Sequence, residues 1–193
     1  YDVIVVSDEI HCDLTKPGTE YIPFASVDDT CRDISVTCIA PTKTFNLAGL
    51  QTAAVYAENS ILHHRMWRQL NTDEVAEPNA FAIQATIAAF QYGEEWLDEL
   101  REYVEKNKQY VTEFLQEKIP FIHPVAGEAT YLMWLDCRKI TENGRQFAKF
   151  IRKTSGLYVS GGNQYGRGGE GFLRVNVATS KLVVEDGMQR LYE

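Results

Sequence analysis

The feature that most restricts the fold is an apolar, β-branched run near the start of the chain, Val3 to Val6, which ends in Ser7-Asp8. Such a run is typical of a parallel strand buried on both faces, and a strand of that kind needs neighbouring strands and covering helices. We therefore expect a central strand of an α/β sheet. We also expect sequence before Tyr1, which would make this chain the C-terminal part of a longer protein.

Further strands and helices are indicated along the 193 residues. Strands are predicted at 34–40, 53–57, 131–136, 157–160 and 172–178, and helices at 60–71, 80–92, 94–118 and 145–154, with a closing helix near Ser180. The polar stretch 15–33 is expected to be a connection with little regular structure. The helix at 80–92 is apolar nearly all round, so we expect it to be deeply buried or at a subunit contact.

Composition and charge exclude several classes of protein. An apolar content of 45%, with 9 Phe, 10 Tyr and 3 Trp, excludes a disordered chain. A formal charge of −8 argues against a nucleic-acid partner, and no apolar run approaches the ~20 residues of a membrane span. The four cysteines have no zinc-like spacing, and we predict no metal site, reduced thiols and a cytoplasmic location.

Two ionisable side chains follow the ends of the first two predicted strands. Asp8 ends the first, and Lys43 lies just beyond the second. In open α/β sheets, ligands bind outside the carboxyl ends of the strands, where a carboxylate and an amine could hold a charged heteroaromatic ligand or form an imine. From spacing alone, a plainer interpretation is favoured, in which Asp8 caps a turn and Lys43 is solvated.

Three motifs favour the functional interpretation. They are S-D-E-I-H at 7–11, A-P-T-K-T-F-N-L-A-G-L at 40–50 and F-L-R-V-N-V-A at 172–178. In this order and spacing the chain resembles the fold-type I enzymes that use pyridoxal 5'-phosphate (PLP), the aspartate aminotransferase superfamily. The cystathionine β-lyase group of carbon–sulfur lyases is the most similar branch.

The resemblance implies an α/β fold, the C-terminal part of a fold-type I PLP-dependent transferase. Residues 1–95 would be the C-terminal half of the PLP-binding large domain, and 96–193 the connecting long helix and a small C-terminal domain. It implies a homodimer. It also implies a PLP-dependent carbon–sulfur β-lyase, which cleaves a sulfur-containing amino acid to a thiol, pyruvate and ammonia. An aminotransferase and a non-catalytic module that keeps only the fold are the alternatives.

The resemblance also assigns site residues. Lys43 would form an imine with the cofactor aldehyde and later move the substrate α-proton. Asp8 would pair with the pyridine nitrogen and favour its protonated form. His11 would contact the cofactor oxygen, although a histidine satisfied beside a strand end is an open alternative.

Arg174 is the expected ligand of the substrate carboxylate. Strand alternation places it on one face with Phe172 and Asn176, and a guanidinium can bind a carboxylate through two parallel hydrogen bonds. An ordinary surface arginine at a strand edge is the alternative. The glycine-rich stretch 161–171 does not follow the pattern of a phosphate-binding loop, so we expect a loop that leads into the Arg174 strand.

Two positions depart from the aminotransferase pattern. Gln51 stands where these enzymes usually have a phosphate-binding arginine, eight residues after the lysine, and Ala40 stands where many have a serine. We therefore expect Thr42 to contribute to phosphate binding. The missing arginine fits the lyase group better than ordinary aminotransferases.

Overall fold

The computed structural model describes residues 3–193, and the chain divides into two compact units, Tyr1–Leu100 and Arg101–Glu193. The division falls inside a long helix, α5 (Glu94–Lys118), which is predicted at the same bounds. It lies five residues after the position expected from the sequence. The roles assigned to the two parts by resemblance stay predictions.

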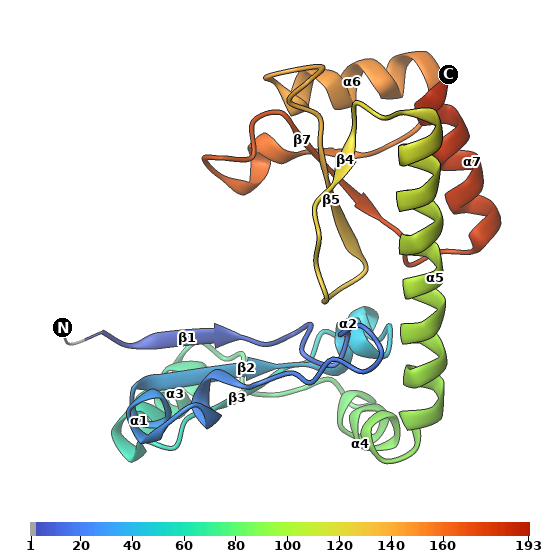
Figure 1. Ribbon diagram of the computed structural model, residues 1–193. Coiled ribbons are helices and arrows are strands. Elements are labelled where there is room, and N and C mark those ends of the chain that lie inside the picture. Colours follow the sequence, from blue (N-terminus) through green and yellow to red (C-terminus); the bar gives the residue numbers. More distant parts are fainter. Residues whose placement is uncertain (1–2) are drawn as a thin grey trace. The chain divides into compact units, whose positions relative to one another are not determined.

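The first unit contains a three-stranded sheet in the order β1 (Val5–Asp8), β2 (Ser35–Ile39) and β3 (Ala54–Tyr56) (Figure 1). β1 and β2 are parallel, with a register that runs from Val5 opposite Ser35 to Asp8 opposite Cys38. β3 is antiparallel to β2. The parallel pair brings the carboxyl ends of β1 and β2 to the same edge of the sheet.

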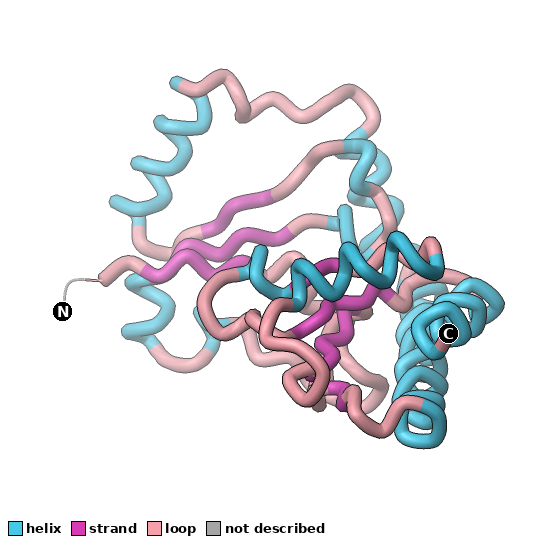
Figure 2. Tube along the Cα trace, turned by 90° about the horizontal axis from the view of Figure 1, so that it is seen from above, coloured by secondary structure: helices cyan, strands magenta, loops and turns pink. Residues whose placement is uncertain are grey.

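Four helices of the first unit are α1 (Asp29–Ile34), α2 (Pro41–Thr44), α3 (Ser60–Thr72) and α4 (Ala82–Tyr92). A long loop joins α3 to α4 (Figure 2). The expectation of little regular structure at 15–33 is wrong at its end, since α1 begins there after a short 3-10 helix, Phe24–Ser26. Asp28 is a helix cap, whose carboxylate accepts a hydrogen bond of 2.7 Å from the Cys31 amide.

Two segments expected to need cover are exposed in the described residues. β1 begins two residues later than predicted, and Val6 is 66% exposed, so the described residues do not cover both faces of the strand. Among the described residues of α4 only Ala82 is buried, so this chain does not bury the helix deeply. The pattern of apolar residues indicates that a segment needs apolar partners, but it does not indicate whether this chain supplies them. A subunit contact at α4 therefore stays a prediction.

The second unit is a four-stranded antiparallel sheet in the order β4 (His123–Pro124), β5 (Leu132–Asp136), β7 (Phe172–Asn176) and β6 (Ser160–Gly161). Two helices accompany it, α6 (Gly144–Ser155) and α7 (Lys181–Tyr192) (Figure 1). As predicted, Gly156 ends α6 with a left-handed backbone, φ 75°. The strand predicted at 157–160 is wrong in its bounds, because only its last residue pairs with β7.

The core of the second unit lies on one face of its sheet. Leu135 of β5 and Leu173 of β7 are fully buried, as is Val177 just after β7. The buried amide of Asn107 on α5 donates hydrogen bonds to the carbonyls of Val177 (2.9 Å) and Thr179 (3.0 Å), which fixes this end of β7 to the helix. The predicted alternation of β7 is therefore confirmed: Leu173 faces the core.

No helix within residues 3–193 combines the length and apolar character that a bilayer crossing requires.

Candidate functional site

The edge where β1 and β2 end carries the two predicted groups. Asp8 is the last residue of β1 and pairs with Cys38, and Lys43 lies on α2, which follows β2 directly. Burial, and next the negative charge of Asp8, raise the pKa of the Cys38 thiol, so the carboxylate acts across the strand pair. Asp8 also accepts a hydrogen bond of 3.3 Å from the Ile10 amide, so the turn-cap interpretation holds for one carboxylate oxygen.

Lys43 is the exposed residue of an otherwise buried turn of helix. Pro41, Thr42 and Thr44 of α2 are buried. Among the described residues, the Lys43 amine has no hydrogen bond or ion pair with another protein group, and the Thr42 hydroxyl has no hydrogen bond. Within residues 3–193, an amine and a hydroxyl without protein partners are thus located just past β2, next to the strand that ends in Asp8.

One side-chain hydrogen bond joins α2 to the loop after β1. The hydroxyl of Thr44, which is fully buried, donates to the Asp13 carboxylate at 3.0 Å. His11 lies in the same loop, where its carbonyl accepts a hydrogen bond from the Leu14 amide at 3.0 Å. The loop that holds His11 and the helix that holds Lys43 are therefore fixed to each other, which local sequence patterns do not indicate.

Aromatic packing holds α2 from its other end. The Phe45 ring packs edge-on against Phe90 at 5.2 Å between centroids and lies 6.0 Å from the Trp96 ring. Such pairs contribute roughly 0.5–1.5 kcal/mol beyond the area that they bury. These contacts restrict the helix that carries Lys43.

Glu9 directly follows Asp8 in the candidate site, and sequence reasoning missed it. Only 5% of it is exposed, and its carboxylate accepts hydrogen bonds from the Ser7 hydroxyl (2.9 Å) and the Phe24 amide (3.1 Å). The motif S-D-E-I-H carries a signal for this, because an acidic residue just past a strand end needs hydrogen-bond donors when the following loop buries it. Glu9 anchors the loop at 20–24 to the end of β1.

Cys12 is the thiol nearest in sequence to these groups, and it is not poised for chemistry. Burial, followed by the charge of Asp13, raises its pKa to about 11. The thiol is therefore protonated at neutral pH and is a poor nucleophile. Within the described residues, no group of three His, Cys, Asp or Glu side chains could hold a metal ion.

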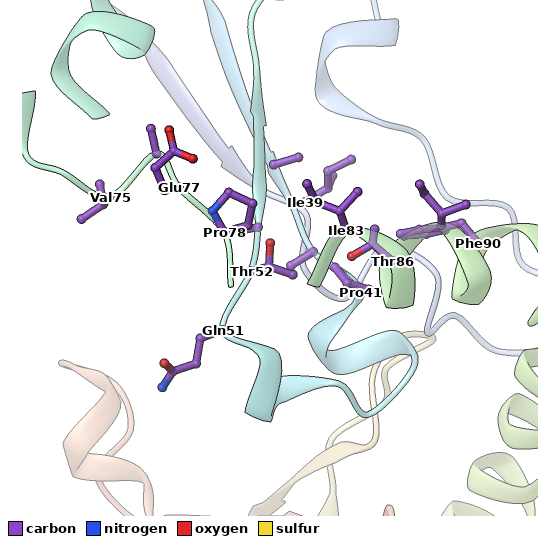
Figure 3. Close-up of a pocket in the computed structure, with 15 residues that line it drawn as sticks. Ile39, Pro41, Gln51, Thr52, Val75, Glu77, Pro78, Ile83, Thr86 and Phe90 are labelled. Carbon is purple, nitrogen blue, oxygen red and sulfur yellow. The ribbon is translucent and has the colours of Figure 1, made fainter. Parts of the chain in front are cut away.

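A cavity of about 490 Å³ lies beside the predicted site without including it. It is lined by apolar residues such as Ile39, Pro41 and Phe90, together with Gln51 (Figure 3). Asp8, His11, Thr42 and Lys43 are absent from its lining. Its polar side chains are Gln51, Thr52, Glu77 and Thr86, and none of them is an amine that could attach an aldehyde. We therefore assign the candidate site to the strand-end groups instead.

Arg174 belongs to the second unit, in the middle of a row of residues across its sheet. It pairs with Trp134 of β5 on one side and Ser160 of β6 on the other. Its guanidinium lies over the ring of Tyr165, 4.1 Å from the centroid. Among residues 3–193, no carboxylate forms an ion pair with Arg174. Sequence reasoning missed Tyr165, which stands in the glycine-rich stretch.

Asp136 is the acidic residue placed diagonally to Arg174 on the same face, because it pairs with Phe172. Its carboxylate is held by Arg138 instead. Nε of Arg138 donates a hydrogen bond of 2.9 Å to one carboxylate oxygen, and Nη2 donates one of 2.6 Å to the other. These bonds are the main cause that lowers the pKa of Asp136 to about 2. Asp136 is thus charged but already paired.

Replacing Arg138 with glutamine should raise the pKa of Asp136 from about 2 toward its ordinary value of 3.8. A pKa lowered by folding stabilises the protein above pH 4, and this contribution is lost as the pH falls from about 4 toward 2. Carboxyl ¹³C shifts of labelled aspartate measure the titration. Lys149→Gln, which changes an exposed lysine of α6, is the control and should leave it unchanged. A variant carboxyl that still titrates near pH 2 would show that backbone donors are sufficient.

Comparison with known proteins places these features in a family. The family model described as aminotransferase class I and II matches residues 1–191. Cystathionine beta-lyase PatB of Bacillus subtilis (strain 168) is 39% identical over 191 residues, which are 99% of this chain and 49% of the relative. Protein MalY of Escherichia coli (strain K12) is 30% identical over 192 residues, 99% of this chain and 48% of the relative.

Solved structures agree with the sequence relatives. Cystalysin from Treponema denticola, which contains PLP, has a TM-score of 0.94 at 29% identity and is matched over 98% of this chain and 48% of its own. The PLP-bound C-S lyase from Staphylococcus hominis has a TM-score of 0.87 at 33% identity, over 99% of this chain and 49% of its own. The chain spans about half the length of the curated relatives it matches, and it belongs to the aminotransferase class I and II family.

Proposed function

We propose that the protein is a PLP-dependent carbon–sulfur β-lyase, which cleaves a sulfur-containing amino acid to a thiol, pyruvate and ammonia. One observation carries the proposal: Asp8 and the helix of Lys43 follow the carboxyl ends of two adjacent parallel strands. Ligands of open α/β sheets bind at that edge. Relatives named cystathionine beta-lyase support the lyase reaction over others of the family.

The donors at this edge suit PLP. An amine without a protein partner can react with an aldehyde, a carboxylate can pair with a pyridinium, and a free hydroxyl can donate to a phosphate oxygen. Lys43, Asp8 and Thr42 are these three groups. The unit around them would be the C-terminal half of the cofactor-binding domain.

When bound, PLP supplies an aldehyde carbon for covalent attachment and a ring that withdraws electrons from the substrate. Lys43 Nζ would hold the cofactor through its aldehyde and, once the amine is free again, would take the substrate α-proton. Asp8 would lie beside the pyridine nitrogen, where its negative charge would favour the protonated ring. His11 would donate a hydrogen bond to the ring oxygen, and Arg174 would bind the substrate carboxylate through two parallel hydrogen bonds.

An aminotransferase is the second candidate, since the family model carries that name. The two reactions need the same residues up to removal of the α-proton. Gln51, in place of the arginine usual in the aminotransferases, supports the lyase. Its backbone is left-handed, with φ 49°.

We further propose a homodimer located in the cytoplasm. The apolar side chains of α4 and of the residue just before it support a subunit contact, because Phe81, Ile83 and Phe90 are each at least half exposed in the described chain.

The test uses the full-length protein loaded with PLP. With L-cystathionine and no keto acid, a lyase releases pyruvate, which lactate dehydrogenase detects through NADH oxidation. With 2-oxoglutarate added, an aminotransferase would instead form glutamate. Pyruvate without keto acid is the expected result, and product that appears only with the keto acid would replace the lyase proposal by the aminotransferase. No turnover of either kind would favour a non-catalytic module.

A further inference from the structure

Tyr165 covers one face of the arginine to which we assign the substrate carboxylate. The distance of 4.1 Å from the Arg174 guanidinium carbon to the ring centroid is that of a close cation–π contact. A ring on that face restrains the plane of the guanidinium, while the N–H groups at its edge stay available to an acceptor. Two parallel hydrogen bonds to a carboxylate require such an orientation.

The Tyr165 ring is itself held in place. Trp134, the β5 neighbour of Arg174, stands edge-on to it, with 5.5 Å between centroids and an interplanar angle of 77°. The side-chain amide of Gln164 donates a hydrogen bond of 2.7 Å from Nε2 to the Tyr165 hydroxyl. The ring therefore has two contacts that fix its orientation besides that with Arg174.

The glycine-rich stretch explains how Tyr165 reaches this position. Tyr165 ends the short 3-10 helix Gly162–Tyr165, and the chain then returns past the start of that helix. A Cβ atom at Gly162 would lie 2.3 Å from the Gly169 carbonyl oxygen and 2.9 Å from the Trp134 ring. A Cβ atom at Gly169 would lie 2.2 Å from the Gly162 carbonyl oxygen. Only glycine permits this approach, which folds the loop down beside Trp134.

Arg174 has no competing acid within its own unit. The Asp136 carboxylate, diagonal to it, is occupied by Arg138, and Arg138 lies over the Phe172 ring at 5.0 Å. The guanidinium is thus oriented by an aromatic ring but not neutralised by a protein carboxylate, which suits a site for an external one.

We propose that Tyr165 is a positioning residue, which holds the Arg174 guanidinium in the plane that binds the α-carboxylate of an amino-acid substrate. The glycine-rich stretch 161–171 is the support that places it. This inference rests on the proposed function, because it takes Arg174 as the carboxylate ligand.

The test measures kcat and KM for L-cystathionine, and the dissociation constant of L-alanine from the visible absorbance of the bound cofactor, in the full-length enzyme. Tyr165→Leu should raise KM and the dissociation constant about five- to tenfold, with kcat within about twofold, because the contact acts on binding. Tyr165→Met, another side chain without an aromatic face, should behave alike. Tyr165→Phe keeps the ring and should stay within about twofold of wild type.

Arg174→Gln separates this inference from the proposed function. It should raise the dissociation constant of L-alanine by about 100-fold, since it removes both charge-assisted hydrogen bonds. If Arg174→Gln weakens binding and the Leu and Met variants do not, Tyr165 has no positioning role and the assignment of Arg174 stands. If Arg174→Gln binds L-alanine normally, the assignment of Arg174 fails. A Phe variant as weak as Leu would also overturn the inference.

Discussion

Replacing Lys43 with alanine should lower the rate of pyruvate release from L-cystathionine on the order of 10⁴-fold. Under the proposed function, the variant lacks both the group that would move the α-proton and the amine that would attach the cofactor. Two measurements check this result in the full-length protein: kcat, and mass spectrometry after borohydride reduction with PLP. The peptide that contains Lys43 should carry the reduced cofactor in wild type and not in the variant.

Two control variants accompany this experiment, one at Lys43 itself and one at a lysine far from it in the sequence. Lys43→Arg keeps a positive charge but not a nucleophile at neutral pH, so it should be as inactive as the alanine variant. Lys149→Ala removes an exposed lysine of α6 and should leave kcat within about twofold. A reduced cofactor found on another lysine of the wild-type protein would remove Lys43 from the site and the lyase mechanism with it.

Asp8→Asn should be the next most damaging change, with kcat lowered on the order of 10²- to 10³-fold. The substitution keeps the shape of the side chain and removes the charge that, under the proposed function, would hold a proton on the pyridine nitrogen. The turn after β1 should survive, because the asparagine oxygen can still accept the hydrogen bond from the Ile10 amide. Steady-state kinetics and the thermal unfolding midpoint of the full-length protein are the measurements.

The matched control is Asp29→Asn, which removes a carboxylate in the first turn of α1. In the described part of the chain that carboxylate pairs with the exposed Arg32, and its side chain is 96% exposed, so kcat should stay within about twofold of wild type. Equal kcat for Asp8→Asn and wild type would contradict the role of Asp8. A loss of thermal stability in Asp8→Asn alone would indicate a turn cap instead.

Much of the fold could be predicted from local patterns. The helix α5 was predicted at its observed bounds, and Gly156 ends α6 as its position just after a helical pattern indicated. The strands β2 and β7 were predicted within one or two residues, because alternation and a following proline or polar residue are local signals. The bounds of β1 and β6 differ more from those predicted, because register and not apolar pattern alone decides which residues pair with a neighbouring strand.

The candidate site divides in the same way. By itself the sequence determined that Asp8 and Lys43 stand at or just past the ends of two strands, since strand propensity and residue identity are local properties. Only the tertiary structure decided that β1 and β2 are adjacent and parallel, and that Thr44 bonds to Asp13. It alone placed Tyr165 over Arg174, because that contact depends on strand register and on the close approach of two glycines, which join residues that no local pattern relates.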